Sequence, residues 1–183
     1  MTKRIILVSL CFAMALTVII LFLFFLNAKN AAIKTVEEYL DLESQMKLPA
    51  EYCLENENLT ISAKELEKIK SEFSEQAKCI MTDEYSLLFC EYANCVFDAQ
   101  AQKKYTVSEM TREFIKTDKL RFVDFNSVII DITAAYSSVE YDIKDGILNR
   151  YDICNDKGMK YEICLKKENG KWLINDMTKN IPE

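Results

Sequence analysis

The chain has 183 residues, 23 of them basic and 29 acidic, with three glycines, two prolines and no histidine. Without histidine it cannot build by itself a Ser-His-Asp or Cys-His relay, a zinc-protease helix or a two-histidine iron site. The scarcity of glycine and proline argues against disordered linkers and glycine-rich phosphate loops. Carboxylate, tyrosine, lysine and thiol chemistry remain.

The first residues predict a membrane span. Residues 5–26 carry no charge, and as a helix they would reach roughly 33 Å, enough to cross a hydrocarbon core of about 30 Å. Lys3 and Arg4 precede this stretch directly, and basic flanks are retained on the cytoplasmic side. We therefore expect a cell-membrane protein with residues 1–4 in the cytoplasm, a single transmembrane helix over 5–26, and one domain outside over 27–183.

A cleaved signal peptide ending at residues 26–28 is the alternative. The apolar region of a signal peptide runs about 7–15 residues, and small residues precede its cleavage site. This stretch is longer, and Phe22, Phe24 and Phe25 occupy the region where small residues would be expected. Both features favour a retained anchor.

The charge of the external part limits its partners. Lys3 and Arg4 are the only charged residues before Asn27, so the remaining 21 basic and 29 acidic residues give a formal charge of −8. An acidic domain without a basic cluster lacks the electrostatic footprint for nucleic acid or anionic lipid headgroups. Proteins or neutral small molecules are therefore the expected partners.

The first helix of the domain continues directly from the span. It covers residues 27–47, Pro49 ends it, and residues 51–59 are polar and predict a loop. Apolar residues recur on one face at spacings of three and four: Ile33, Val36, Tyr39, Leu40 and Met46. The domain is thus expected to sit close to the lipid surface.

Two further helices have clear start signals. Ser62 and Glu65 form a capping box that opens the second helix, whose inward residues are Leu66, Ile69, Phe73, Ala77 and Ile80. Thr82 caps the third, with Asp83 and Glu84 in its first turn. Its predicted inward stripe is Tyr85, Leu88, Phe89, Tyr92, Val96 and Ala99.

The pattern changes after a short fourth helix. Residues 106–109 form another capping box and predict this helix, with Val107, Met110 and Phe114 inward. From Leu120 the apolar period becomes two, which is typical of strands. The alternation changes parity near residues 137–138, where we expect a turn or a bulge.

Two Xaa-Gly pairs predict hairpins. Asn169-Gly170 is a preferred two-residue turn, and taking it literally pairs Leu165 with Ile174 and Lys167 with Trp172. The packed face would then contain Tyr161, Ile163, Leu165, Trp172 and Ile174. Residues 145–146 predict a longer loop or a bulge, because a two-residue turn would set Tyr141 against Arg150. Helices followed by an antiparallel meander predict an α+β fold, with about three to four helices on a curved sheet.

The C-terminal pattern resembles a known superfamily. Tyr161-x-Ile163-x-Leu165 and Asn169-Gly170-x-Trp172-x-Ile174 look like the closing hairpin of domains similar to nuclear transport factor two, and the order of elements agrees over roughly residues 31–178. The resemblance implies a cone-shaped α+β domain whose interior holds a pocket in some members and is non-catalytic in others. The layout is also similar to the bitopic scaffold subunits of type IV secretion and conjugation machines, which implies self-association.

Enzymes of this superfamily commonly place an Asp, Tyr or His in the cone. Here Asp124 shares a predicted strand face with Leu120 and Phe122, so it is the candidate ligand-pocket carboxylate, and the alternative is an ordinary strand-end aspartate. Asp131 has the opposite parity and is expected to be solvated. The tyrosines at inward spacings are most simply core residues with one wet end.

Six of the seven cysteines lie outside the span and are candidates for disulfides: Cys53, Cys79, Cys90, Cys95, Cys154 and Cys164. Cys90 and Cys95, five residues apart on one helix, point about 140° apart and cannot bridge. In an oxidising compartment we expect at least one disulfide, and buried thiols are the alternative. No two cysteines have the C-x-x-C spacing of a zinc site, so no metal or other cofactor is expected.

The sequence favours a membrane-anchored scaffold or protein-binding domain, not an enzyme. Its partners would be other membrane or surface proteins, with possible self-association and no nucleic acid. A small-ligand sensor and a histidine-free lyase or isomerase remain as alternatives. The interior of the cone distinguishes them, because an open cavity with converging polar groups favours a ligand and a filled interior favours a scaffold.

Overall fold

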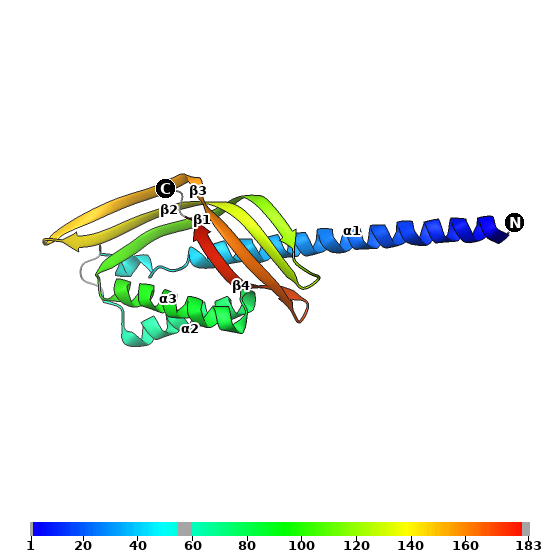
Figure 1. Ribbon diagram of the computed structural model, residues 1–183. Coiled ribbons are helices and arrows are strands. Elements are labelled where there is room, and N and C mark those ends of the chain that lie inside the picture. The colour runs from blue at the N-terminus through cyan, green and yellow to red at the C-terminus, as the bar shows by residue number, and fades with distance from the viewer. Residues whose placement is uncertain (1, 55–59, 181–183) are drawn as a thin grey trace.

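The computed structural model describes the backbone of residues 2–54 and 60–180, and the side chains of residues 11–179 except 55–59 and 155–157. One long helix runs into a domain in which further helices lie beneath a curved sheet (Figure 1). The elements are α1 (Thr2–Glu43), the 3-10 turn η1 (Ala50–Tyr52), α2 (Ala63–Ile80), α3 (Asp83–Ala101), β1 (Tyr105–Phe122), β2 (Ser127–Lys144), β3 (Ile147–Glu168) and β4 (Lys171–Asn180).

Helix α1 runs without a break from a part with exposed apolar side chains into the core of the domain. The large apolar side chains between Phe12 and Leu23 are exposed, and among the described residues α1 alone is long and apolar enough to cross a membrane. Beyond residue 27 the same helix enters the core, where Ala32, Val36 and Tyr39 are fully buried. The predicted continuity of the apolar stretch with the first helix of the domain is confirmed, although the helix ends at Glu43 and not at Lys47.

The four strands form an antiparallel sheet in the order β1-β2-β3-β4. One face packs against the helices, and the other carries ion pairs, in which Arg121 lies 3.1 Å from Glu162 and 3.9 Å from Asp131. Helices on a single face of an antiparallel sheet make an α+β fold, as predicted. Strand β4 pairs only with residues 160–168 of β3, so the first half of β3 forms an edge of the sheet.

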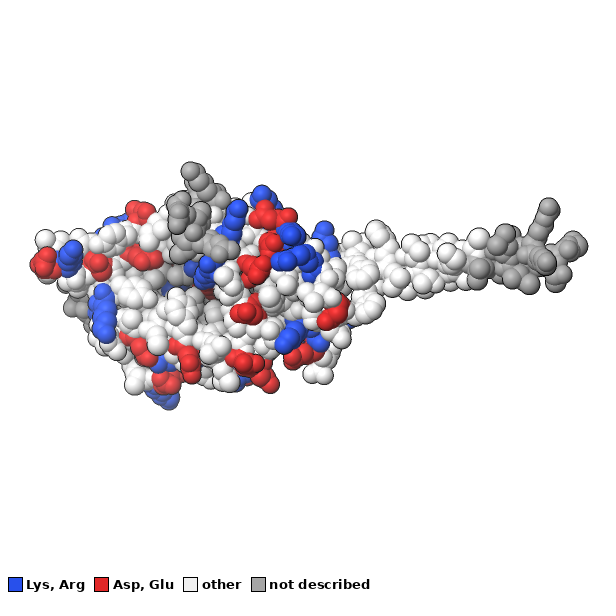
Figure 2. All heavy atoms as spheres, in the orientation of Figure 1, with Lys and Arg blue, Asp and Glu red and all other residues white. Residues whose placement is uncertain are grey.

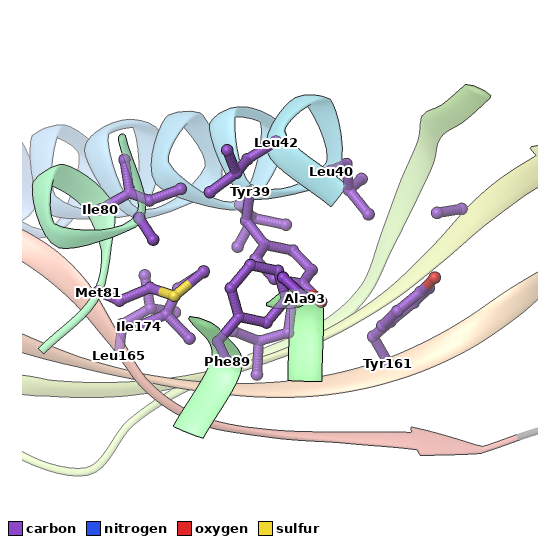
Figure 3. Close-up of a cluster of buried hydrophobic side chains, with 14 of the residues drawn as sticks. Tyr39, Leu40, Leu42, Ile80, Met81, Phe89, Ala93, Tyr161, Leu165 and Ile174 are labelled. Carbon is purple, nitrogen blue, oxygen red and sulfur yellow. The ribbon is translucent and has the colours of Figure 1, made fainter. Parts of the chain in front are cut away.

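The core fills the space between α1, α3 and the sheet. Tyr39, Phe89 and Ala93 meet in its middle, with Tyr161 facing them from β3 (Figure 3). The rings of Tyr39 and Phe89 are 5.6 Å apart, and those of Phe73 and Phe97 meet edge to face at 5.4 Å. Aliphatic and aromatic side chains therefore fill the space between the helices and the sheet.

The hairpin between β3 and β4 has the predicted register. Leu165 lies opposite Ile174 and Lys167 opposite Trp172, across a turn in which Asn169 and Gly170 both have positive φ. Positive φ at both central residues is the requirement that makes Asn-Gly favourable in such turns. All five residues of the predicted packed face are buried: Tyr161, Ile163, Leu165, Trp172 and Ile174.

The predicted short helix at residues 106–109 is wrong, since β1 begins at Tyr105. Register shifts interrupt its pairing with β2 between Val107 and Glu109, between Phe114 and Lys116, and again before Lys119. Each shift adds a residue to the strand. The inward residues of β1 therefore do not alternate regularly as in an ideal strand. Their irregular spacing is what led to the prediction of a helix.

The hairpin at residues 145–146 is also tighter than predicted. Lys144 pairs directly with Ile147, and Tyr141 does lie opposite Arg150. This register is compatible with packing because Tyr141 lies on the face away from the helices, buried against Cys53 and Leu54. The parity change in β2 thus reflects a small second core, and the nearby register shift lies between Ala134 and Tyr136 rather than at 137–138.

The second and third helices begin at the predicted residues, but the Thr82 side chain makes no capping hydrogen bond, and the buried face of the third helix also differs. Ser62 Oγ accepts a hydrogen bond from the Glu65 amide at 3.2 Å, as the capping box requires. On α3, however, Leu88 and Tyr92 are exposed. The buried stripe is Ser86, Phe89, Ala93, Phe97 and Gln100.

Candidate functional site

A cleft of about 330 Å³ opens where the aromatic core ends, at the end of the sheet away from the exposed part of α1. Its floor comes from the first half of β1 and the second half of β2, and its wall comes from α3 and the segment after α1. The lining residues are Met46, Tyr92, Val96, Tyr105, Val107, Met110, Arg112, Tyr136 and Glu140.

The polar groups of the cleft are joined to one another. The guanidinium of Arg112 lies 4.1 Å from the ring centroid of Tyr136, a cation–π contact. Hydroxyls of Tyr136 and Ser138 lie 2.6 Å apart, and Glu140 Oε1 accepts from them at 3.1 and 2.8 Å. The cleft therefore presents an ordered polar patch beside apolar walls.

Two tyrosines of the cleft, Tyr105 and Tyr136, hold their protons. Burial raises the pKa of Tyr105 and of Tyr136 above the ordinary value for a phenol, and the Glu140 carboxylate raises that of Tyr136 further. A phenol with a raised pKa is neutral at physiological pH and offers its O–H as a donor. These side chains are suited to hydrogen bonding and stacking rather than to removing protons.

A buried ion cluster lies behind the cleft. Glu43 is fully buried at the end of α1, its Oε2 lies 3.0 Å from Arg112 Nε, and its Oε1 contacts Lys179 Nζ. A carboxylate at the C-terminus of a helix is repelled by the helix dipole, so Glu43 depends on these two cations. The cluster ties the end of α1 to β1 and β4 and holds Arg112 in place.

Two buried tyrosines surround this cluster. Burial and the Glu43 carboxylate raise the pKa of Tyr39 and of Tyr161 well above the ordinary value. Among the described residues the Tyr39 hydroxyl has no hydrogen-bond partner. Both phenols therefore stay neutral beside the buried charges.

Gln100 connects the segments that form the cleft. It is fully buried on α3, its Oε1 accepts from the amides of Leu48 and Val107 at 3.3 Å, and its Nε2 donates to the Met46 carbonyl at 3.1 Å. These bonds satisfy backbone groups that could not reach water. They also fix the wall at Met46 relative to the floor at Val107.

The rim of the cleft is apolar and exposed. Tyr92, which lines the cleft from α3, is 56% exposed. On the sheet, Tyr151 lies opposite the cleft residue Glu140, and Ile153 lies opposite Ser138. Directly paired residues share a face, so this end of β3 extends the floor with two more exposed apolar side chains.

The predicted pocket carboxylate is not in this cleft. Asp124 is exposed in the turn between β1 and β2, where its Oδ1 accepts a hydrogen bond from the Asn126 amide at 2.6 Å. The prediction extended the face of Leu120 and Phe122 by one step, but the strand ends at Phe122. Asp124 stabilises a turn, which is the alternative that the sequence also allowed.

The disulfide candidates are dispersed over the fold, and no disulfide links the described ones. Cys53 is buried with its Sγ 3.1 Å from Thr106 Oγ1. Cys79 and Cys95 are exposed on α2 and α3, while Cys90 and Cys164 are half-buried. Cys154 is exposed on the edge half of β3. A disulfide in an oxidising compartment stays a prediction, with free thiols as its alternative.

Sequence reasoning missed Glu43, Arg112 and Gln100. Each is a polar residue in an otherwise inward position: Glu43 lies four residues after Tyr39, and Gln100 lies seven after Ala93. A charged residue on an apolar stripe is the signal that could have found them. Within the described part of the chain, no group of three or more His, Cys, Asp or Glu converges as a metal site.

Comparison with known proteins leaves the family open. No protein-family model and no curated protein matches the chain. Its fold is similar to the intermembrane-space region of the chloroplast protein ARC6, with a TM-score of 0.48 and 10% identity over 82% of this chain and 94% of that one. It is also similar to an NTF2-like protein of unknown function from Prochlorococcus, with a TM-score of 0.30 and 15% identity over 50% of this chain and 62% of the other.

Proposed function

We propose that the chain is a membrane-anchored, extracytoplasmic protein-binding domain that takes a segment of a partner protein into the cleft. One observation carries the proposal: the cleft has the exposed side chain of Tyr92 on α3 along one side, and the exposed side chains of Tyr151 and Ile153 on β3 extend its floor on the other. The partner is a membrane or surface protein, or a second copy of this chain.

The residue types of the cleft support this proposal. Tyrosine, methionine and arginine are enriched in protein interfaces, and tyrosine and arginine dominate their binding energy. Here Tyr92, Tyr105, Tyr136, Met110 and Arg112 lie around one hollow. A peptide side chain could fill the hollow while the rim covers flanking residues.

The continuity of α1 supports a role in an assembly. The helix that would cross the membrane also contributes Tyr39 and Leu40 to the core, and the hydroxyl of Thr35 donates to the Trp172 carbonyl at 3.1 Å. A domain attached in this way has a set distance and orientation relative to the bilayer. This arrangement suits docking between proteins of the same membrane.

A small-ligand sensor is the second candidate, because a hollow of about 330 Å³ is within the range of small-molecule sites. The filled interior and the exposed rim favour the protein partner. A lyase or isomerase has less support, since the raised pKa values of Tyr105 and Tyr136 leave them poor bases.

The orientation in the membrane predicts a labelling pattern. In a chain whose only cysteine is Cys95, an exposed residue on α3, a membrane-impermeant maleimide should react in intact cells. The matched control carries Thr2→Cys as its only cysteine and should react only after permeabilisation. The reverse pattern would place the domain in the cytoplasm. Far-UV circular dichroism of both chains checks that the cysteine replacements preserve the fold.

The cleft predicts site-specific crosslinks in native membranes. A photo-crosslinking amino acid at Tyr92 or Tyr151 should form an adduct with one defined protein, or with a second copy of the chain. The matched control carries the same group at Lys68, whose side chain is 73% exposed on α2, and should not form this adduct.

A second substitution tests whether the adduct depends on the cleft. Ile153→Glu, at an exposed position, should reduce the adduct yield at Tyr92 about tenfold or more, because a charge in an apolar contact removes much of a hot spot. Equal adducts at all three positions, or an adduct unaffected by Ile153→Glu, would contradict the proposal. Saturable binding of a small metabolite at Arg112 without any adduct would favour the sensor.

A further inference from the structure

The turn between β1 and β2 lies against the apolar part of α1. The ring centroid of Phe125 is 5.8 Å from that of Phe24 and 6.2 Å from that of Phe25, and the ring of Phe122 is 4.8 Å from Phe25. Figure 1 shows this turn beside the helix at the end of the domain from which α1 projects. Residues 100 positions apart thus form one aromatic cluster.

The depth of this cluster follows from the helix. Phe24 and Phe25 belong to the uncharged stretch that ends at Leu26, and that stretch is barely longer than the hydrocarbon core it would cross. Both phenylalanines must therefore lie at the outer boundary of the core. A turn that packs against them lies at the same depth, where aromatic residues are enriched in membrane proteins.

The turn exposes two large apolar side chains, beside the exposed polar residues Asp124 and Asn126. Val123 and Phe125 are 63% and 60% exposed although their neighbours pack against the helix. In Figure 2 uncharged surface continues from the helix onto the adjoining end of the domain. Nothing else among the described residues covers these two side chains, and the lipid around α1 is the nearest apolar medium.

Several backbone groups of the turn form hydrogen bonds within the protein, which lowers the cost of leaving water. The amides of Val123 and Asp124 donate to the Ser127 carbonyl at 2.9 and 3.3 Å, and the Asn126 carbonyl accepts from the Lys167 amide at 2.8 Å. The Asp124 carboxylate accepts from the Asn126 amide. Unsatisfied backbone groups are costly near the hydrocarbon, and the amides of Val123, Asp124 and Asn126 are all paired within the protein.

A lysine marks the boundary with water. The Lys167 ammonium lies 5.4 Å from the ring centroid of Phe24 and 6.0 Å from that of Trp172. Lysines at the ends of membrane spans extend their charge to the headgroup layer while their methylenes stay in apolar surroundings. Lys167 is in the position for such a contact with lipid phosphates.

We propose that the β1–β2 turn is a second membrane contact, in which Val123 and Phe125 enter the bilayer interface beside α1. This inference rests on the proposed span of α1 and adds a lipid-binding surface to it. Two contacts restrict tilting of the domain, so the cleft at the opposite end of the sheet is held away from the lipid and toward partner proteins.

Fluorescence quenching by brominated phospholipids tests the proposal on the full chain in vesicles. Trp172 is the only tryptophan, so Trp172→Phe provides a background for single tryptophans at three exposed positions. Phe125→Trp reports the turn, Phe22→Trp reports the span, and Ile147→Trp reports the hairpin far from the membrane. The first two should lose most of their emission in vesicles with bromines near the headgroups, and Ile147→Trp should lose none.

The three positions separate the possible failures. Quenching at Phe22→Trp without quenching at Phe125→Trp would overturn the second contact and leave the anchor intact. Quenching at neither position would overturn both the anchor and the contact. If Trp172→Phe disturbs the fold, Phe125→Cys carrying an environment-sensitive fluorophore provides the same measurement with Trp172 retained. A shift of its emission to that seen in water would overturn the contact.

Discussion

Glu43→Ala is expected to lower the free energy of unfolding by about 3–5 kcal/mol, as breaking a buried ion pair does. The carboxylate is fully buried, and Arg112, with a side chain only 9% exposed, would be left without its counter-ion. Lys179 is 29% exposed and can reach water more easily. Urea unfolding of the full chain in mild detergent, followed by the emission of Trp172, would measure the change.

The same helix offers a matched control. Glu38 pairs with Lys34 at 3.4 Å, but both side chains are exposed, so Glu38→Ala should change stability by less than about 0.5 kcal/mol. A similar small change for Glu43→Ala would mean that water reaches the cluster. Replacing Glu43, Arg112 and Lys179 together by leucine or methionine should recover much of the lost free energy of unfolding. Buried ion pairs can often be replaced by apolar side chains of similar volume without loss of stability.

The effect of Glu43→Ala should extend to the cleft. Arg112 holds its position over Tyr136 while its Nε faces Glu43. Without that carboxylate the guanidinium would turn toward water or toward Glu140. Under conditions in which the variant remains folded, the crosslink from Tyr92 should therefore weaken, whereas Glu38→Ala should leave it unchanged.

Trp172→Ala should destabilise the protein by a similar amount, about 3–5 kcal/mol, the usual range for emptying a large aromatic site. Trp172 is 5% exposed, and its ring lies 6.5 Å from that of Phe122. Its carbonyl also accepts the hydrogen bond from Thr35 on α1. The residue thus joins β4 to α1 and to β1, and its removal opens a void where three elements meet.

Because this substitution removes the fluorescent probe, unfolding is followed by far-UV circular dichroism. Leu87→Ala is the control, since Leu87 is 65% exposed on α3 and surface truncations usually stay within about 0.5 kcal/mol. A loss below about 1 kcal/mol for Trp172→Ala would show that the site collapses or that the side chain is mobile.

Several elements of the fold were predictable because their signals are local. The uncharged stretch at 5–26, the Ser62–Glu65 capping box and the Asn169-Gly170 turn each depend on residues within a few positions of one another. The hairpin register followed from the turn alone, and with it the burial of Trp172 and Ile174. The α+β order followed from the change in apolar period.

Long-range pairing decided the rest. The register shifts in β1 give the inward residues of this strand a spacing like that of a helix. Only its pairing with β2 shows that the segment is a strand. Tyr141 packs against Cys53 and Leu54 in a small second core. The two-residue turn at 145–146 is therefore compatible with burial of this side chain. Asp124, which was predicted to face a pocket, lies in a turn because β1 ends two residues before it.

The amino-acid sequence by itself determined the apolar span, the helix starts and the closing hairpin, because each is encoded by neighbours along the chain. Only the tertiary structure brought Glu43, Arg112 and Lys179 together from α1, β1 and β4, and only it set Phe125 against Phe24. Contacts between residues so far apart depend on how the sheet curves over the helices, and no local pattern encodes that curvature.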